Sequence, residues 1–204
     1  MKKTTLILLA FIPLFLNAQI NIKLSADVGR NFYYFINHEK NFEDFHTINN
    51  SFNYSVGCSL EKKVSKLSSF ETGLYVDFKS NDVTFKDVFN DNKIEFVYTR
   101  NVSRIHIPLL YKKNLKKNLG FSVGVTGKFL ISETKNPYYV SRFFNMDINA
   151  GIYSKITKNI ELGIFYSHSA YSIFKVNEFM PTKLYYITHS VTLSVSYKLF
   201  NIGK

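Results

Sequence analysis

Residues 185–199 alternate between apolar and polar side chains with a period of two along almost their whole length. This period predicts a strand with one apolar and one polar face. The segment is longer than an ordinary strand of about 5–6 residues and long enough to cross a bilayer, which takes about 9–11 tilted residues. The apolar face carries Tyr185, Ile187, Val191, Leu193, Val195, Tyr197 and Leu199.

Seven earlier segments show the same alternation less cleanly, so the chain is expected to form eight strands. On their polar faces Ser, Thr, Gly and Asn predominate, with scattered charged residues. The expected segments are residues 20–28, 52–60, 70–78, 105–111, 121–129, 144–152 and 160–166.

Short and long connectors alternate strictly between these segments. Eight antiparallel strands joined in this way form an up-and-down β-barrel with every long loop at one end. The last strand then pairs with the strand beginning near Ile20, and both chain ends lie at the short-turn end, which is periplasmic in an outer membrane. The short connectors are 62–68, 112–118 and 155–159; the long ones are 35–50, 80–98, 132–142 and 173–183.

One segment breaks the phase of the pattern. Apolar residues occupy even positions within 94–98 but odd positions within 105–109. Either a β-bulge near 101–103 shifts the phase, or residues 93–98 belong to the loop. We expect a strand from about 100 to 112 that continues irregularly beyond residue 100.

The first 18 residues have the layout of a secretory signal peptide. Lys2 and Lys3 precede an apolar run over residues 6–16, and Ala18 offers a cleavage site. The run is shorter than the roughly 20 residues of a spanning helix. The expected organisation is a signal peptide at 1–18 and an outer-membrane β-barrel domain at 19–204.

The chain is basic and rich in Phe and Tyr. Its formal charge of +11 falls to +9 when Lys2 and Lys3 leave with the signal peptide. The remaining lysines gather in short connectors and form no continuous stripe, so nucleic acid is not expected as a partner. Phosphate-bearing lipid headgroups suit them better, although solvated turn lysines would give the same pattern. The 34 Phe and Tyr residues suit aromatic girdles at the bilayer interfaces.

Two eight-stranded architectures remain open: a transmembrane barrel and a soluble lipocalin-like barrel whose apolar face points inward. The small, mostly uncharged polar faces favour the transmembrane barrel, because an eight-stranded barrel is filled by its own side chains. Charged residues on those faces would have to pair inside, since an unpaired buried charge costs several kcal/mol. No internal disulfide is expected, because Cys58 is the only cysteine.

The segment Ile107-Pro108-Leu109-Leu110-Tyr111 resembles a feature of the PorT-like family of outer-membrane β-barrels. The aromatic closing strand, Val195-Ser196-Tyr197-Lys198-Leu199-Phe200, is similar to the family's final strand. Members commonly end on that aromatic residue, whereas Asn201 to Lys204 follow Phe200 here, and Phe200 is out of phase with Tyr197. The resemblance implies insertion by the barrel-assembly machinery and transfers no catalytic residue.

Two patterns could carry chemistry on the strands. Ser167-His168-Ser169-Ala170 is the segment nearest to the His-x-Ser pair of barrel enzymes that deacylate lipid A, but Ala170 stands where the serine is needed. Ser169 points to the opposite face of a regular strand, out of reach of the base. His106, beside Arg104, is expected to be a hydrogen-bonded interior residue.

The first long connector holds the remaining candidate ligands. Its histidines and carboxylates could bind a metal, but they follow no fixed ligand spacing. They are His38, His46, Glu39, Glu43 and Asp44.

These patterns together predict a non-enzymatic integral protein of the outer membrane of a Gram-negative bacterium. No catalytic, cofactor-binding or metal-binding residue is assigned, and no cofactor is expected. The expected partners are outer-membrane lipid and lipopolysaccharide, the barrel-assembly machinery, and a protein met by the loops at 35–50, 80–98 and 132–142. The alternatives are a small passive, porin-like pore, a lipid A-modifying enzyme and a soluble periplasmic binder.

Overall fold

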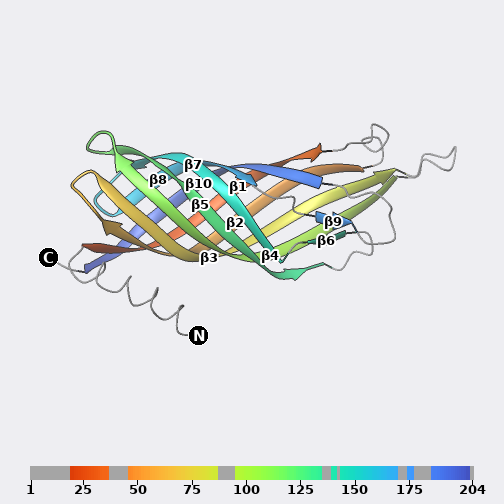
Figure 1. Ribbon diagram of the computed structural model, residues 1–204, viewed down its shortest axis with the longest axis horizontal. Helices are drawn as coiled ribbons and strands as arrows, with labels where there is room; N and C mark the ends of the chain where they lie inside the picture. The colour runs from red at the N-terminus through yellow and green to blue at the C-terminus, as the bar shows by residue number, and fades with distance from the viewer. Residues whose placement is uncertain are drawn as a thin grey trace, which may run out of the picture.

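The computed structural model describes residues 19–36, 46–86, 95–134, 139–141, 143–169, 174–176 and 185–202. Eight antiparallel strands close into a barrel in the order β1-β10-β8-β7-β5-β4-β3-β2 (Figure 1). The predicted eight-stranded fold is therefore confirmed. The barrel strands are β1 (Ile20–Ile36), β2 (His46–Lys63), β3 (Ser68–Lys86), β4 (Glu95–Asn114), β5 (Leu119–Glu133), β7 (Phe144–Lys155), β8 (Ile160–Ser169) and β10 (Tyr185–Ile202).

Three short turns lie at one end of the barrel, where β1 also begins and β10 ends (Figure 1). We call this the turn end and the opposite end the loop end. In the first turn, the backbone N–H of Val64 donates to the carbonyl of Ser68, and the Ser65 hydroxyl accepts from two backbone amides. Ile156 and Thr157 repeat the pattern in the third turn. Because Ser and Thr hydroxyls replace backbone partners in such turns, these tight connections occur where the sequence predicted them.

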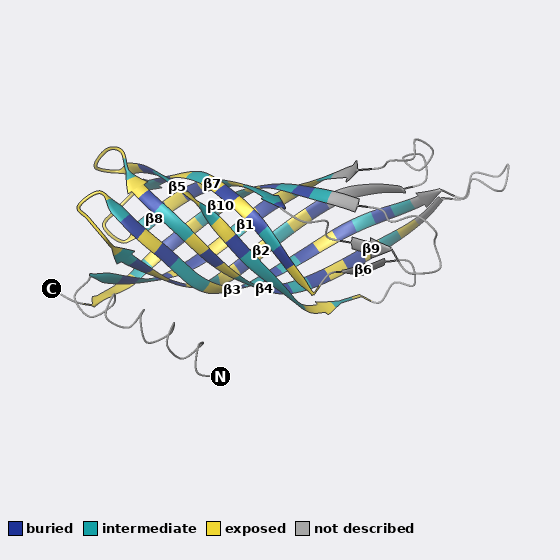
Figure 2. Cartoon of the chain, viewed as in Figure 1, coloured by how far each residue is buried: buried dark blue, intermediate teal, exposed yellow. Residues whose placement is uncertain are grey.

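Burial alternates along the described parts of the barrel strands, with mostly apolar side chains outside and mostly polar side chains inside (Figure 2). On β10, Val191, Leu193 and Val195 are exposed, whereas Ser190 and Ser196 are buried. A lipocalin-like barrel would have the opposite arrangement, because water would meet its polar face. The soluble alternative is therefore wrong, and the exposed apolar side chains form a belt suited to lipid.

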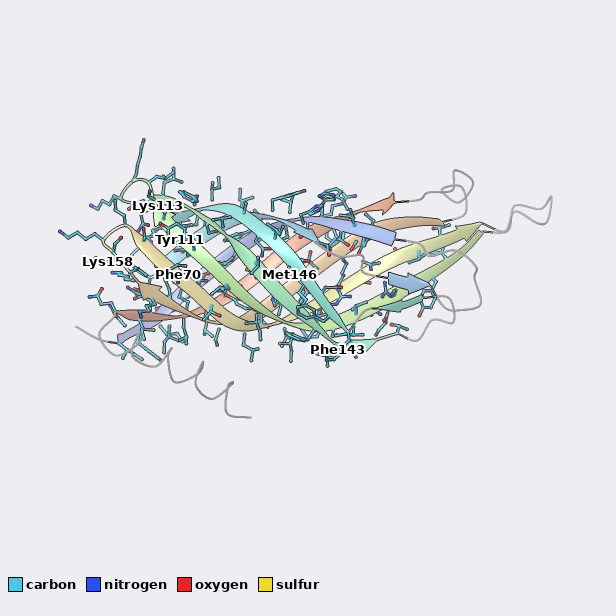
Figure 3. The ribbon with its side chains drawn as sticks, viewed as in Figure 1. Phe70, Tyr111, Lys113, Phe143, Met146 and Lys158 are labelled. Carbon is cyan, nitrogen blue, oxygen red and sulfur yellow. The ribbon has the colours of Figure 1, made fainter. Side chains whose placement is uncertain are left out.

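Aromatic side chains gather toward both edges of this apolar belt (Figure 3). Near the turn end, the rings of Phe70 and Tyr111 lie 5.5 Å apart, and beyond them lysines such as Lys113 extend away from the barrel. Toward the loop end, the Phe129 ring lies 6.1 Å from the ring of Phe143 and 5.0 Å from that of Phe144, which begins β7. Two aromatic groups at these positions match the girdles expected at the two bilayer interfaces.

A bulge near the end of β10 explains the phase of Phe200. Ile22 pairs with Phe200 but Lys23 pairs with Lys198, so Leu199 is one extra residue in the ladder. Leu199 and Phe200 are consequently both exposed, and β10 continues to Ile202. The final aromatic residue therefore faces outward, although the sequence alternation ends before it.

The bulge predicted near 101–103 does not change the faces of β4, because Arg100, Val102 and Arg104, all at even positions, are buried alike. β4 pairs with β3 without a register shift from Ser68 to Lys86, and it begins at Glu95, earlier than predicted. Its pairing with β5 shifts between Ser103 and Arg104, and Ile131 is the extra residue. The early part of β4 is thus strand, and its even positions face inward with Arg100.

The strands reach unequal distances at the loop end (Figure 1). β3 and β4 contain 19 and 20 residues, whereas β7 and β8 contain 12 and 10. A small second sheet pairs β6 (Tyr139–Ser141) with β9 (Phe174–Val176) across two predicted long connectors. The described residues include no helix long and apolar enough to cross a membrane. Residues 1–18, which contain the predicted signal peptide, lie outside the described residues.

Candidate functional site

The barrel interior near the turn end contains a network of two lysines and three glutamates. Because small polar residues occupy most inward positions around them, these long side chains have room to meet near the barrel axis. They come from five different strands, and all are buried. We call this set the turn-side network: Lys23, Glu61, Glu71, Lys112 and Glu161.

Each lysine of the network contacts more than one carboxylate. The Nζ atom of Lys23 lies 2.5 Å from Glu61, 3.0 Å from Glu71 and 3.5 Å from Glu161. The Nζ atom of Lys112 lies 3.1 Å from Glu71 and also pairs with Glu161. Removing five charged groups from water is expensive, and multiple pairing offsets that cost. The network therefore ties opposite walls of the barrel together and occupies its cross-section.

Tyr153 completes this layer from β7. Lys112 Nζ lies 4.2 Å from the centre of the Tyr153 ring, a cation–π distance. Gly120 on β5 makes the position possible, because a Cβ atom there would lie 2.4 Å from the tyrosine ring. The Tyr153 hydroxyl donates to the side-chain carbonyl of Asn114 at 3.1 Å. An inward aromatic ring and a facing glycine thus close the interior next to the charges.

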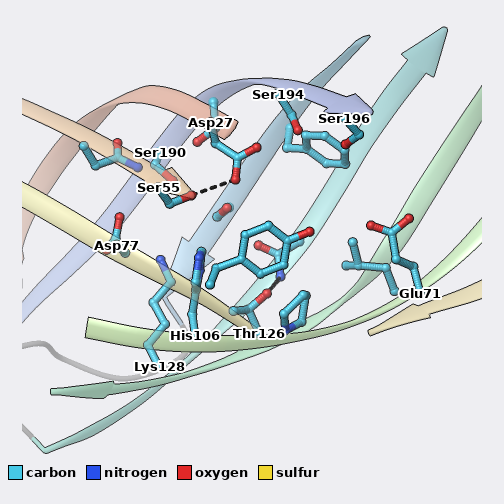
Figure 4. A pocket seen from close by; sticks show the side chains of 18 of the residues that line it. Asp27, Ser55, Glu71, Asp77, His106, Thr126, Lys128, Ser190, Ser194 and Ser196 are labelled. Atoms are coloured by element: carbon cyan, nitrogen blue, oxygen red, sulfur yellow. Dashed lines mark hydrogen bonds between the residues drawn. The ribbon is translucent and has the colours of Figure 1, made fainter. Parts of the chain in front are cut away.

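A cavity of about 100 Å³ lies above this layer. Figure 4 shows polar side chains converging on it, among them Asp27, which accepts a 2.7 Å hydrogen bond from Ser55. Tyr75 spans part of the same space, and its ring lies where a side chain on Gly57 would otherwise stand. The cavity is smaller than the roughly 300–1,000 Å³ of typical ligand pockets. It is best described as residual space in a packed polar interior.

Further charged pairs fill the interior toward the loop end. Lys128 pairs with Asp147 at 2.7 Å, and Arg100 pairs with Glu133. Lys79 is buried with its Nζ atom 4.6 Å from the centre of the Tyr33 ring. Charged and aromatic side chains therefore fill the described interior on both sides of this cavity.

His168, the candidate base of the deacylase hypothesis, lies on the outer face of β8. Its Nδ1 atom is 3.2 Å from Nδ1 of His189, the residue directly opposite on β10. Ser169 is buried on the inward face. The predicted separation of histidine and serine is therefore observed, and the two side chains cannot act as a base and nucleophile pair.

His106 faces inward, as predicted, and lines the cavity. Its ring meets Tyr75 edge to face, with centroids 5.0 Å apart. Its Nε2 atom makes no hydrogen bond to any residue that the structure describes, which differs from the expected hydrogen-bonded role. Arg104 is also buried, two residues away on the same face.

The structure does not test the candidate metal ligands of the first long connector. His38, Glu39, Glu43 and Asp44 lie outside the described residues, and His46 begins β2 without a described side chain. Within the described ranges, no three His, Cys, Asp or Glu side chains gather as metal ligands. The connector hypothesis thus stays a prediction.

The sequence predicted that interior charges must pair, but not which partners they find. Lys23 and Glu71 are 48 residues apart and come together only when the barrel closes. A more local signal was available for the aromatic residues. Gly73 and Tyr75 occupy successive inward positions, as do Gly163 and Phe165, and each ring leans over its glycine.

The barrel architecture was compared with those of known proteins. Several solved structures share the fold at low sequence identity, which shows the fold alone. A search of curated protein sequences finds no match. The similar structures include OprG from Pseudomonas aeruginosa (TM-score 0.51, 8% identity, 90% of this chain and 96% of that chain), Neisserial surface protein A (0.51, 13%, 87% and 97%) and AlkL in lipid bilayers (0.52, 9%, 92% and 94%).

The family comparison covers nearly the whole chain. Residues 17–201 match the profile described as an outer membrane protein β-barrel domain. This match agrees with the closed eight-stranded barrel and its outward apolar belt. The chain therefore belongs to the outer membrane protein β-barrel domain family and is a protein of the bacterial outer membrane.

Proposed function

We propose that this protein is a non-enzymatic, non-conducting scaffold that holds its long loops for contact with a partner outside the cell. The turn-side network carries the proposal, because it fills the barrel cross-section with paired charges. The Nζ atoms of Lys23 and Lys112 lie within 3.5 Å of carboxylate oxygens from three other strands. Transport of ions through this layer would require breaking several buried pairs at once.

The uneven loop end supports a display role. β3 and β4 pair as far as Lys86 and Glu95, whereas β4 meets β5 only from Val102 onward. A ribbon of β2, β3 and β4 therefore rises beyond the neighbouring wall. Such a support suits binding loops, which commonly sit on a stable scaffold.

The outer surface supports lipid and lipopolysaccharide as surrounding partners. The apolar belt suits acyl chains, and lysines such as Lys113 and Lys158 extend from the turn end toward headgroup phosphates (Figure 3). Insertion would depend on the barrel-assembly machinery. The Ile107–Tyr111 segment and the closing strand support placement in the PorT-like group within the broader family.

Planar-bilayer recording of the purified, folded protein tests the closed interior. We expect no stable channel events from the wild type, and stable channels would favour the passive-pore alternative instead. Lipid A from cells with and without the protein should be identical by mass spectrometry. A change in acylation that His168→Ala removed would overturn the non-enzymatic assignment.

Cysteine labelling tests which end faces outward. In a Cys58→Ser background, Val97→Cys on the projecting part of β4 should react with a membrane-impermeant maleimide on intact cells. Lys113→Cys at the turn end should react only after the outer membrane is permeabilised. Reversed labelling would contradict display of the long loops at the cell surface.

A further inference from the structure

A pair of histidines and a tyrosine meet on the outer surface of the barrel. His168 on β8 and His189 on β10 are direct cross-strand partners, with ring centroids 4.6 Å apart. Tyr166, two residues before His168, turns its hydroxyl to Nδ1 of His189. Three polar atoms from two neighbouring strands thus converge at one point.

The place of this cluster on the barrel keeps it accessible. Both histidines are only half-buried, and Tyr166 is 45% exposed. Below them, Val191 and Ile164 belong to the exposed apolar belt, while β8 ends at Ser169, one residue beyond His168. The cluster therefore lies at the edge of the belt nearest the loop end, where water and solutes reach it.

The three polar atoms of this cluster cannot all form good hydrogen bonds with one another. Nδ1 of His189 is approached by both Nδ1 of His168 and the Tyr166 hydroxyl. A neutral imidazole nitrogen has either one hydrogen to donate or one lone pair to accept with, so it serves one of these neighbours well and not both. A cation bound between the three groups would accept one lone pair from each of them.

The spacing of the two imidazoles fits one metal ion. Two nitrogens bound tetrahedrally to Zn²⁺ at about 2.0–2.1 Å lie roughly 3.3 Å apart. The observed separation of the two Nδ1 atoms is 3.2 Å. Cross-strand register sets this spacing, because directly opposed side chains on antiparallel strands are close neighbours.

We propose that His168 and His189 form a surface site for a divalent transition-metal ion, with the Tyr166 oxygen as a third ligand and water completing the shell. Imidazole ligands suit Zn²⁺, Cu²⁺ and Ni²⁺, whereas Mg²⁺ and Ca²⁺ require mostly oxygen ligands. The site is independent of the scaffold role, because it uses the outer face of β8 and β10 and none of the interior charges.

The test uses full-length protein made without a polyhistidine tag, folded in detergent and freed of metal with EDTA. Zn²⁺ is titrated by isothermal calorimetry into the wild type, H168Q, H189Q and Y166F. We expect one ion per chain, at least tenfold weaker binding in each histidine variant and a smaller loss in Y166F. The interior variant H106Q should bind like the wild type, and a heat-shifted SDS gel band confirms that each variant is folded.

A second measurement needs no variant. Electron paramagnetic resonance of the wild type with one equivalent of Cu²⁺ should show hyperfine coupling to two imidazole nitrogens. Absence of stoichiometric binding would overturn the proposal, leaving the two histidines as a hydrogen-bonded pair. Binding that survives in H168Q/H189Q but is lost in H38Q/H46Q would also overturn it, and would assign the metal to the first long connector.

Discussion

Lys23 on β1 and Glu71 on β3 meet across the barrel interior, with Nζ 3.0 Å from Oε2. Strand β2 separates their strands, so the contact bridges over one strand and does not run along one ladder. The same glutamate oxygen also contacts Lys112 at 3.1 Å. Glu71 therefore links β1, β3 and β4 inside the barrel, and the stability of the fold is expected to depend on these shared pairs.

Lys112→Met should lower the free energy of unfolding by about 3–5 kcal/mol, the usual effect of leaving a buried charge without its partner. The substitution removes the Lys112 contacts to Glu71 and Glu161 while nearly preserving side-chain volume. Urea unfolding in lipid vesicles, followed by tyrosine fluorescence, measures the change. Lys113→Met, one residue along and exposed, should shift stability by less than about 0.5 kcal/mol. Equal stability of the two variants would show that the network contributes nothing net.

Gly163→Ala should destabilise the barrel by about 1–3 kcal/mol through overpacking. A Cβ atom at this position would lie 2.4 Å from the Phe165 ring, and its three nearest neighbours would all be atoms of that ring. Phe165→Leu should therefore relieve much of the cost, giving a favourable coupling in a double-mutant cycle. Gly127→Ala, whose nearest contact is 3.3 Å, is the matched control and should be close to neutral. A strictly additive cycle would contradict the role given to Phe165.

Cys58 should resist water-soluble maleimides in the folded, membrane-inserted protein. Its side chain is exposed on the outer face, and its cross-strand neighbours Leu24 and Leu74 are exposed apolar residues of the belt. Lipid therefore covers the thiol. Mass spectrometry should find labelling only after denaturation, or with a lipophilic maleimide. In a Cys58→Ser background, Lys66→Cys in the first turn should label readily without denaturation, and rapid labelling of native Cys58 would argue against burial in lipid.

Val195→Arg should destabilise the inserted barrel by about 2–4 kcal/mol, because its side chain lies near the middle of the lipid-facing stretch of β10. Leu199→Arg, closer to the turn end, should cost only about 0–1 kcal/mol, since arginine reaches the interface there. Reversible unfolding from vesicles compares the two. A larger cost at Leu199 would mean that the belt is placed differently along the barrel.

The alternation of apolar and polar residues predicted the positions of the barrel strands well but predicted where the strands end poorly. On β10, period-two alternation is a local property, so the lipid face and the Ser/Thr face could be predicted from residues 185–199 alone. At the loop end the strands are polar and lose this contrast, so β3 and β4 extend farther than expected. The pairing of β6 with β9 joins two predicted connectors, and neither has an alternating pattern long enough to reveal it.

The turn-side network was likewise predictable only in part: the inward positions of its residues follow from the local sequence, but their pairing does not. Because the inward face of each strand follows from the alternation, Glu61 and Glu71 could be placed inside the barrel from the sequence. Their shared partner Lys23 could not be identified, since closure of the barrel brings residues from distant strands together. The position of Leu199 as a bulge also depends on pairing with β1, which only the closed ladder defines.

The amino-acid sequence by itself determined the number of barrel strands, the face each strand turns to lipid, and the places of the short turns. These features depend on neighbours within a few residues, through side-chain alternation and turn chemistry. Only the tertiary structure decided which buried charges pair, where tyrosine and phenylalanine rings fill the lumen, and that His168 meets His189. These contacts depend on strand register and on closure, which arise when the whole barrel packs around its own side chains.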